Sequence, residues 1–245
     1  MNWYSIEKIN EKLYKISEDK HWERTNMYYL IGQKRNLLID TGTGIKPLKA
    51  VLLEIDNKPI DVVLTHAHWD HMGNIHEFED VYVHAQDLDW VQKGLPVPEA
   101  FIKEMMLKDV DEAFLEGFTY PPLYHKTARN ILEFDFWCIN IIHTPGHSPG
   151  SVCLYDPLNE ILFSGDILYE GTIYCHYEST DPKDLFESIK CIKELKIQRI
   201  FSGHYNDPEI AIINDLYDIM AEFENEKSLH HGSGLKCKES ICLQL

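Results

Sequence analysis

The segment Thr65–Gly73 places three histidines and an aspartate within six positions, directly after an apolar, strand-like run. Such a cluster at the end of a strand is costly to keep unless it holds a metal. Imidazole and carboxylate together suit a borderline cation such as zinc. Alternate residues of an extended loop aim His66 and His68 at one point, while Asp70 and His71 reach a second. The segment therefore predicts a site for two metal ions.

Three further segments place the same kinds of side chain beside a glycine, at or just after the end of a strand-like run. Glycine lets the backbone bend, so that a side chain at a strand end turns toward a common pocket. A polar surface loop that is merely rich in histidine is the alternative, and it does not account for these later segments. The seven candidate ligands are His66, His68, Asp70, His71, His147, Asp166 and His204.

Five motifs, in this order along the chain, resemble the metallo-β-lactamase superfamily. They are Leu38–Gly42, the His-x-His-x-Asp-His run, Pro145–His147, Ser164–Asp166 and Gly203–His204. One such motif alone is suggestive, but five in order are highly specific.

The resemblance also implies a role for each ligand. It implies that the first metal is bound by His66, His68 and His147, the second by Asp70, His71 and His204, with Asp166 bridging both. It further implies that Asp40 lies behind a ligand imidazole and orients that ring through its other nitrogen.

Several residues of this chain differ from those of well-known subgroups of the superfamily, and these differences reduce the number of candidate functions. The best-known β-lactamases have a cysteine where this chain has Asp166, which disfavours antibiotic hydrolysis. Flavodiiron proteins have glutamate at the position of His68 and a flavodoxin module, and glyoxalase II enzymes add a basic helical domain; this chain has none of these. Instead, Asn26–Gly42, Gly150–Asp156 and Ile161–Asp166 resemble acyl-coenzyme A thioesterases of the superfamily.

Hydrophobic periodicity predicts the elements around these motifs. In the first half they are strands at 28–31, 37–40 and 60–64 and a helix at 47–55; in the second, strands at 136–142, 152–155, 161–164 and 199–202 and a helix at 182–195. Two such halves suit an α/β fold, a four-layered αββα sandwich of two mixed β-sheets flanked by helices. We expect one domain over residues 1–228, followed by a C-terminal tail, 229–245.

An insert at 87–125 is rich in methionine and aromatic residues. This pattern predicts amphipathic helices that pack on the core or form a homodimer contact. It also suits a lid over the metals, because methionine and aromatic side chains make adaptable apolar walls for an acyl chain. At the site itself we predict substrate contacts for Trp69, Tyr169 and Tyr174, with the tyrosines as donors to a developing oxyanion.

Composition sets the expected partners and location. The net charge of −17 disfavours nucleic acid as a substrate, so a small molecule is expected. No apolar stretch approaches the ~20 residues needed to cross a bilayer, and the N-terminus lacks a charged start followed by an apolar core. We therefore predict a cytoplasmic protein with no membrane contact.

The six cysteines are too few and too scattered for a disulfide framework, and reduced, mostly buried thiols are expected. Cys175 follows Asp166 closely and is a candidate to face the pocket. Cys237 and Cys242 lie in the expected tail, where a second small metal site is the alternative.

Together these features predict a dinuclear zinc hydrolase, with iron or manganese as alternative metals. A metal-bridging hydroxide would cleave a thioester or activated ester, and acyl-coenzyme A thioesters are the favoured substrates. Asp70 is the predicted catalytic residue, orienting the water and carrying its proton. The alternatives are a lactonase, a mononuclear iron persulfide dioxygenase, and a metal-stabilised interaction module without catalysis.

Overall fold

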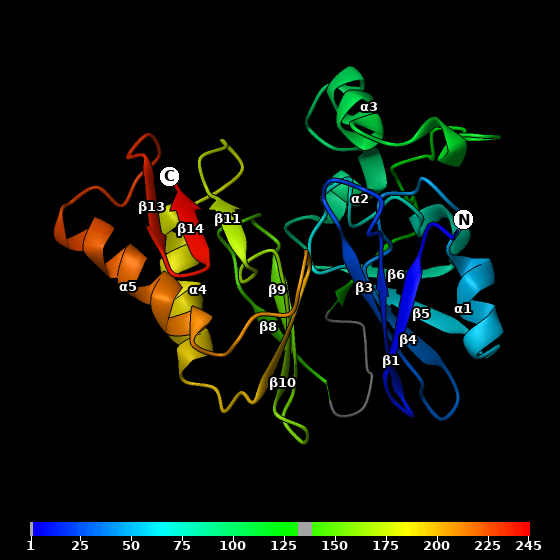
Figure 1. The fold of residues 1–245 in the computed structure, drawn as a ribbon, viewed down its shortest axis with the longest axis horizontal. Coiled ribbons are helices and arrows are strands. Elements are labelled where there is room, and N and C mark those ends of the chain that lie inside the picture. Colours follow the sequence, from blue (N-terminus) through cyan, green and yellow to red (C-terminus); the bar gives the residue numbers. More distant parts are fainter. Residues whose placement is uncertain (1, 132–138) are drawn as a thin grey trace. The chain divides into compact units, whose positions relative to one another are not determined.

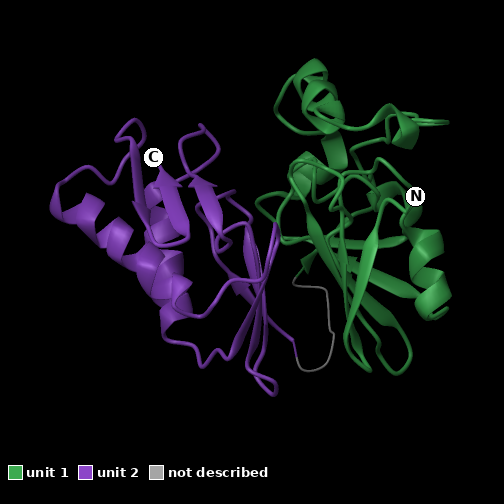
Figure 2. Ribbon diagram, in the orientation of Figure 1, with its two compact units in different colours: residues 1–135 green, residues 136–245 purple. Residues whose placement is uncertain are grey.

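The chain forms two compact units, unit 1 up to residue 135 and unit 2 from residue 136 (Figure 2). The computed structural model describes residues 2–131 and 139–245. Within these residues the fold is mixed α/β, as predicted. Cys138 and the first part of the strand predicted at 136–142 lie outside the described residues. No helix in the described parts of the chain is long and apolar enough to cross a membrane.

Unit 1 is built on a seven-stranded mixed sheet with the strand order β1 to β7 (Figure 1). Strands β1 to β4 pair antiparallel, and β4 to β7 pair parallel. The predicted strand, helix and strand that lead into the histidine loop are confirmed as β4, α1 and β5. The elements are β1 (Ser5–Asn10), β2 (Leu13–Ser17), β3 (Asn26–Leu30), β4 (Asn36–Ile39), α1 (Lys49–Ile55), β5 (Ile60–Val63), η1 (Ile75–Glu77), β6 (Asp80–Val83), α2 (Leu88–Lys93), α3 (Glu99–Leu107), η2 (Glu112–Phe114) and β7 (Arg129–Asn130).

The parallel strands β4 and β5 place two important segments side by side. Every residue of both strands is buried, as expected for parallel strands in the middle of a sheet. In their register Ile39 lies opposite Val63, so both strands end at the same edge of the sheet. The segment that begins with Asp40 and the one that begins with Leu64 therefore leave the sheet from adjacent positions.

The insert packs on the core of unit 1. Ile102 and Met106 of α3 are buried in its hydrophobic cluster, together with Phe114 of η2. The end of α3 is also held by hydrogen bonding, since the Trp22 indole donates to the carbonyl of Met105 at 3.0 Å. The prediction of helices packed on the core is thus confirmed, while the lid and the homodimer contact stay predictions.

Unit 2 contains a four-stranded mixed sheet, β12-β10-β9-β8, and a three-stranded sheet, β11-β14-β13. The predicted hairpin, helix and strand are confirmed as β9–β10, α4 and β12. Asp181 begins α4 by accepting hydrogen bonds from two backbone amides of its first turn, and proline follows at the first helical position. The elements are β8 (Asn140–His143), β9 (Val152–Asp156), β10 (Ile161–Gly165), β11 (Gly171–Tyr174), α4 (Pro182–Lys193), β12 (Arg199–Ser202), α5 (Ile212–Asn225), β13 (Leu235–Lys238) and β14 (Ile241–Gln244).

The end of the chain is ordered, so the prediction of a tail over 229–245 is wrong for residues 235–244. These residues form the antiparallel pair β13–β14, and β14 also pairs parallel with β11. Ile241, Leu243 and Leu245 are buried in the core of unit 2. Two lysines of β13 form ion pairs with α5 and the residue that follows it, Lys236 with two glutamates and Lys238 with two aspartates. The hairpin therefore belongs to the fold, and it forms a sheet that the sequence did not predict.

The prediction of reduced thiols is wrong for Cys237 and Cys242. They lie opposite each other on β13 and β14 and form a disulfide. The prediction is confirmed for Cys153 and Cys175, which are free and buried, and burial raises the pKa of each thiol to about 12. Cys191 is also free but exposed. Cys175 donates a hydrogen bond to the carbonyl of Gly146 at 3.6 Å.

We expect removal of the disulfide to lower the free energy of unfolding by about 2 kcal/mol. The two cysteines are only 5 positions apart, and a bond that closes so short a loop removes little entropy from the unfolded chain. Urea unfolding of Cys237→Ser/Cys242→Ser, with Cys191→Ser as the control, measures the difference. A double variant as stable as the control in oxidising buffer would show that the disulfide adds nothing.

Candidate metal centre

Unit 1 brings together the four candidate ligands of the histidine loop. The loop turns back on itself because the backbone amides of His71 and Met72 both donate to the carbonyl of His68. The ring of His66 lies 4.5 Å from that of His68 and 4.2 Å from that of His71, centroid to centroid. Asp70 Oδ2 lies 3.6 Å from His71 Nε2. His68 is partly exposed and the other three are buried.

Asp40 holds this loop from the neighbouring strand end. Its Oδ1 accepts from the backbone amide of Thr65 at 2.7 Å, and its Oδ2 accepts from the Thr65 hydroxyl at 2.8 Å. The same Oδ2 lies 2.9 Å from His71 Nδ1. A carboxylate at Nδ1 keeps the proton on that nitrogen and leaves Nε2 as a metal ligand. The backbone of Asp40 is left-handed, with φ +60°, a conformation that aspartate tolerates better than most residues.

Unit 2 gathers the other three candidate ligands around one carboxylate. Asp166 directly follows β10, and its Oδ2 lies 2.9 Å from His204 Nε2 and 3.5 Å from His147 Nε2. All three side chains are nearly inaccessible to solvent. A Cβ at Gly203 would lie 2.4 Å from Asp166 Oδ1, so glycine lets the chain after β12 pass this close to the carboxylate.

The chemistry of the two ligand sets fits a metal. Buried carboxylates and imidazoles are costly to keep close together unless a charge compensates them. Histidine nitrogen and aspartate oxygen are ligands for zinc and for iron, and no thiolate contributes to either set.

The three predicted substrate residues have different surroundings. Tyr169 is buried, its hydroxyl donates to the carbonyl of Thr172 at 2.6 Å, and its ring packs edge-on against His204 at 5.2 Å. Its hydroxyl proton is therefore engaged with the backbone. Tyr174 is 45% exposed, and Trp69 is partly buried with its ring edge-on to His21.

Sequence reasoning did not single out Glu18, which is fully buried in unit 1. Its carboxylate accepts from the Trp3 indole and from the backbone amide and hydroxyl of Thr43, each at 2.8 Å. Its pKa is raised from 4.5 to about 7, chiefly by burial and also by the charge of Asp70, although these hydrogen bonds oppose the rise. Because its partners lie 15 and 25 positions away, no local pattern marks Glu18 as buried.

We expect Glu18→Gln to weaken the dependence of stability on pH. Because folding raises the pKa of Glu18, its protonated form favours the folded state; this contribution is present below pH 4.5 and is lost as the pH rises toward about 7. The loss is at most about 3 kcal/mol, at about 1.4 kcal/mol for each pH unit. Urea unfolding of the wild type and of Glu18→Gln between pH 4 and 8 tests this. If the free energy of unfolding changed with pH equally in both proteins, the prediction would be contradicted.

Comparisons with known proteins agree with the family resemblance of the five sequence motifs. A family model described as the metallo-beta-lactamase superfamily matches residues 22–204. Acyl-coenzyme A thioesterase MBLAC2 of Gallus gallus is 27% identical over 229 residues, which cover 84% of this chain and 82% of that protein. The Beta-lactamase-like protein 2 homolog of Drosophila melanogaster is 32% identical over 215 residues, which cover 84% of this chain and 66% of that protein. A crystal structure of TTHA1623 in a di-iron-bound form has a TM-score of 0.58 and 28% identity, covering 78% of this chain and 92% of that one.

The family model spans about three quarters of the chain and includes every candidate ligand from His66 to His204. The resemblance predicted from the five motifs is thereby confirmed. The chain therefore belongs to the metallo-β-lactamase superfamily, and it is a hydrolase of that family with a metal site of histidine and aspartate residues.

Proposed function

We propose that this protein is a dinuclear metal thioesterase that hydrolyses acyl-coenzyme A or a closely related thioester. The observation that carries the proposal is the similarity to an acyl-coenzyme A thioesterase over 84% of the chain. The ligand chemistry supports it, because hydrolysis by a metal centre needs no serine or cysteine nucleophile. The free cysteines Cys153 and Cys175 are both buried and have raised pKa values, which makes them poor nucleophiles.

We propose that the two ligand sets serve one centre. In this assignment His66, His68 and His147 hold one ion, Asp70, His71 and His204 hold the other, and Asp166 contacts both. Two divalent ions bound there would supply a nucleophilic hydroxide from water near neutral pH. Asp70 would hold and move a proton at its carboxylate oxygen, and Asp40 would keep His71 in the required tautomer.

Zinc is the metal we propose, because a closed-shell dication suits hydrolysis without redox chemistry. The ligands alone do not exclude iron, and TTHA1623, which is 28% identical to this chain, was crystallised with two irons. A cytoplasmic location and a homodimer stay predictions, to be tested by cell fractionation and by analytical ultracentrifugation.

The test pairs metal analysis with a substrate panel. Protein purified without added metal should contain about two metal ions per chain, mainly zinc, by mass spectrometry. It should hydrolyse acyl-coenzyme A thioesters with a kcat/KM at least about tenfold above that for lactones, and chelation should abolish turnover. One iron per chain with oxygen uptake on persulfides, or faster turnover of lactones, would overturn the proposal.

A further inference from the structure

Three aromatic side chains of unit 2 form an exposed group at the end of β11, here called the aromatic platform: Tyr174, His176 and Tyr177. The ring of His176 lies 4.1 Å from that of Tyr177 and 5.7 Å from that of Tyr174, centroid to centroid. Tyr174 is 45% exposed and Tyr177 is 51% exposed. Between them Cys175 is buried and fixes the backbone. Solvent-exposed aromatic faces of this kind are suited to stacking a nucleobase.

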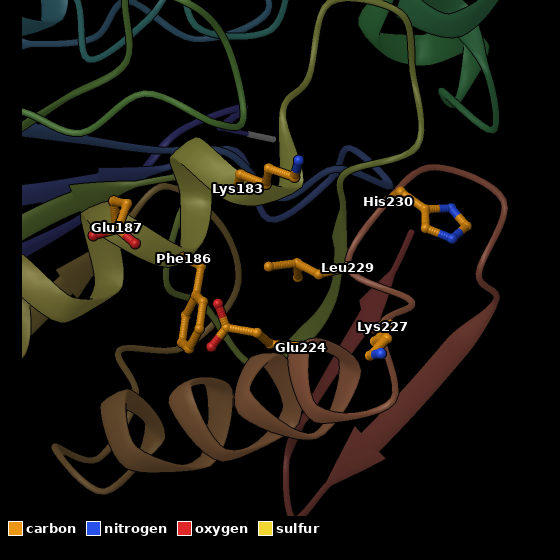
Figure 3. Close-up of a pocket in the computed structure, with 7 residues that line it drawn as sticks. All are labelled: Lys183, Phe186, Glu187, Glu224, Lys227, Leu229 and His230. Atoms are coloured by element: carbon orange, nitrogen blue, oxygen red, sulfur yellow. The ribbon is translucent and has the colours of Figure 1, made fainter.

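A cavity of about 360 Å³ lies in the same unit, between α4, the end of α5 and the segment that follows α5 (Figure 3). Its size falls within the range of about 300–1,000 Å³ typical of small-molecule sites. Figure 3 shows the side chain of Leu229 pointing toward Phe186 of α4. The lining residues are Lys183, Phe186, Glu187, Glu224, Lys227, Leu229 and His230.

Two lysines and two glutamates line this cavity, and one of the glutamates is paired with a lysine outside it. Glu187 forms an ion pair with Lys190 at 2.8 Å, and this hydrogen bond raises the pKa of Lys190, with a smaller contribution from the charge of Glu224. Within residues 2–131 and 139–245, neither Lys183 nor Lys227 forms an ion pair with a carboxylate.

A short turn connects the platform to the cavity. The hydroxyl of Thr180 donates to the carbonyl of Tyr177 at 2.7 Å and lies 3.2 Å from His231 Nε2, next to His230 of the cavity. The following residue, Asp181, begins α4 and accepts from the backbone amide of Lys183. Residues 177–183 therefore run directly from the aromatic platform to Lys183 of the cavity.

The same turn contacts the residue before a candidate metal ligand. The carbonyl of Gly146 accepts from the backbone amide of Asp181 at 2.8 Å and from the thiol of Cys175 at 3.6 Å. A Cβ at Gly146 would lie 2.4 Å from the Cα of Leu185 in α4. The segment that carries His147 thus packs tightly against the loop that carries the platform.

We propose that unit 2 binds the nucleotide part of coenzyme A, an inference that rests on the proposed thioesterase function. The adenine stacks on the aromatic platform, and the phosphates lie at Lys183, Lys227 and His230 of the cavity. The flexible arm of the substrate then runs along residues 175–181 toward His147. Binding of the nucleotide far from the reacting bond would favour acyl-coenzyme A over thioesters that lack it.

Binding of free coenzyme A tests this directly, by calorimetry on the protein as purified. We expect Lys183→Glu/Lys227→Glu to weaken binding at least about tenfold and Tyr177→Ala to weaken it about tenfold, as for the loss of a stacked base. The control Lys20→Glu/Lys34→Glu changes the net charge equally at two exposed lysines of unit 1. Wild-type affinity in the cavity variant, or an equal loss in the control, would overturn the proposal.

A kinetic comparison separates this proposal from the proposed function. For each variant, kcat/KM is measured for an acyl-coenzyme A and for the same acyl group on N-acetylcysteamine, which has no nucleotide. We expect the ratio of the two values to fall at least about tenfold in the cavity variant and to stay constant in the control. An unchanged ratio overturns the nucleotide site while hydrolysis stands. If neither thioester is hydrolysed, the proposed function fails, and the binding experiment still decides whether the nucleotide site exists.

Discussion

Replacing Asp40 by alanine is expected to lower the affinity of the protein for its metal by about 10- to 100-fold, the usual effect of losing the partner behind a ligand histidine. The carboxylate touches His71 Nδ1 and both polar groups of Thr65, so its loss releases the ring and leaves a buried amide without its acceptor. The unpaired amide costs about 1–3 kcal/mol, and alanine at φ +60° adds about 1–2 kcal/mol. Chelator competition measures the affinity and urea unfolding the stability.

Asp40→Asn separates the two effects. Asparagine tolerates the left-handed backbone and still accepts from the Thr65 amide, so this variant should unfold much like the wild type. Its amide group, however, donates where the carboxylate accepted, which favours the tautomer of His71 with the proton on Nε2. We therefore expect a stable protein with a low metal content. Wild-type metal affinity in Asp40→Ala would mean that Asp40 does not orient a ligand.

The elements with strong local patterns were predictable from the sequence. The segments 37–40 and 60–64 were predicted as strands because they are short apolar runs, and α1 because its apolar residues recur at helical spacing. The histidine loop was predictable for a different reason: several ligand-type side chains fall within six positions. A local turn at His68 is enough to gather that set, so no distant contact had to be foreseen.

Features that depend on distant contacts were not predictable. Glu18 has the appearance of a surface residue, and its burial follows from Trp3 and Thr43, which only the folded chain brings to it. The sheet β11-β14-β13 was not predicted, and its parallel pairing joins β14 to a strand some 70 positions earlier. The Cys237–Cys242 disulfide depends on the register of the hairpin, which spacing alone does not determine.

Gly73→Ala is expected to lower the free energy of unfolding by about 3 kcal/mol, at the upper end of the usual cost of steric overlap in a packed region. The backbone amide of Gly73 donates to the carbonyl of Gly42 at 2.7 Å, which joins the end of the histidine loop to the segment after β4. A Cβ at Gly73 would lie 2.1 Å from the carbonyl carbon of Thr43 and 2.3 Å from the amide nitrogen of Gly44. Both are backbone atoms, so no rotamer change relieves the overlap and the two segments must separate.

Separation of the two segments would also displace candidate ligands, because Gly73 lies two residues after His71. The carbonyl of His71 accepts from the amide of Thr41 in the segment after β4. We expect Gly73→Ala to bind metal more weakly although no ligand has been removed. Gly117→Ala is the matched control: its added Cβ meets nothing within 4 Å, so only its left-handed backbone, φ +71°, opposes the change, at a cost of about 1 kcal/mol. Urea unfolding and metal analysis of both variants decide the matter. Equal stability of the two would mean that the histidine loop and the segment after β4 are not held together as tightly as these contacts require.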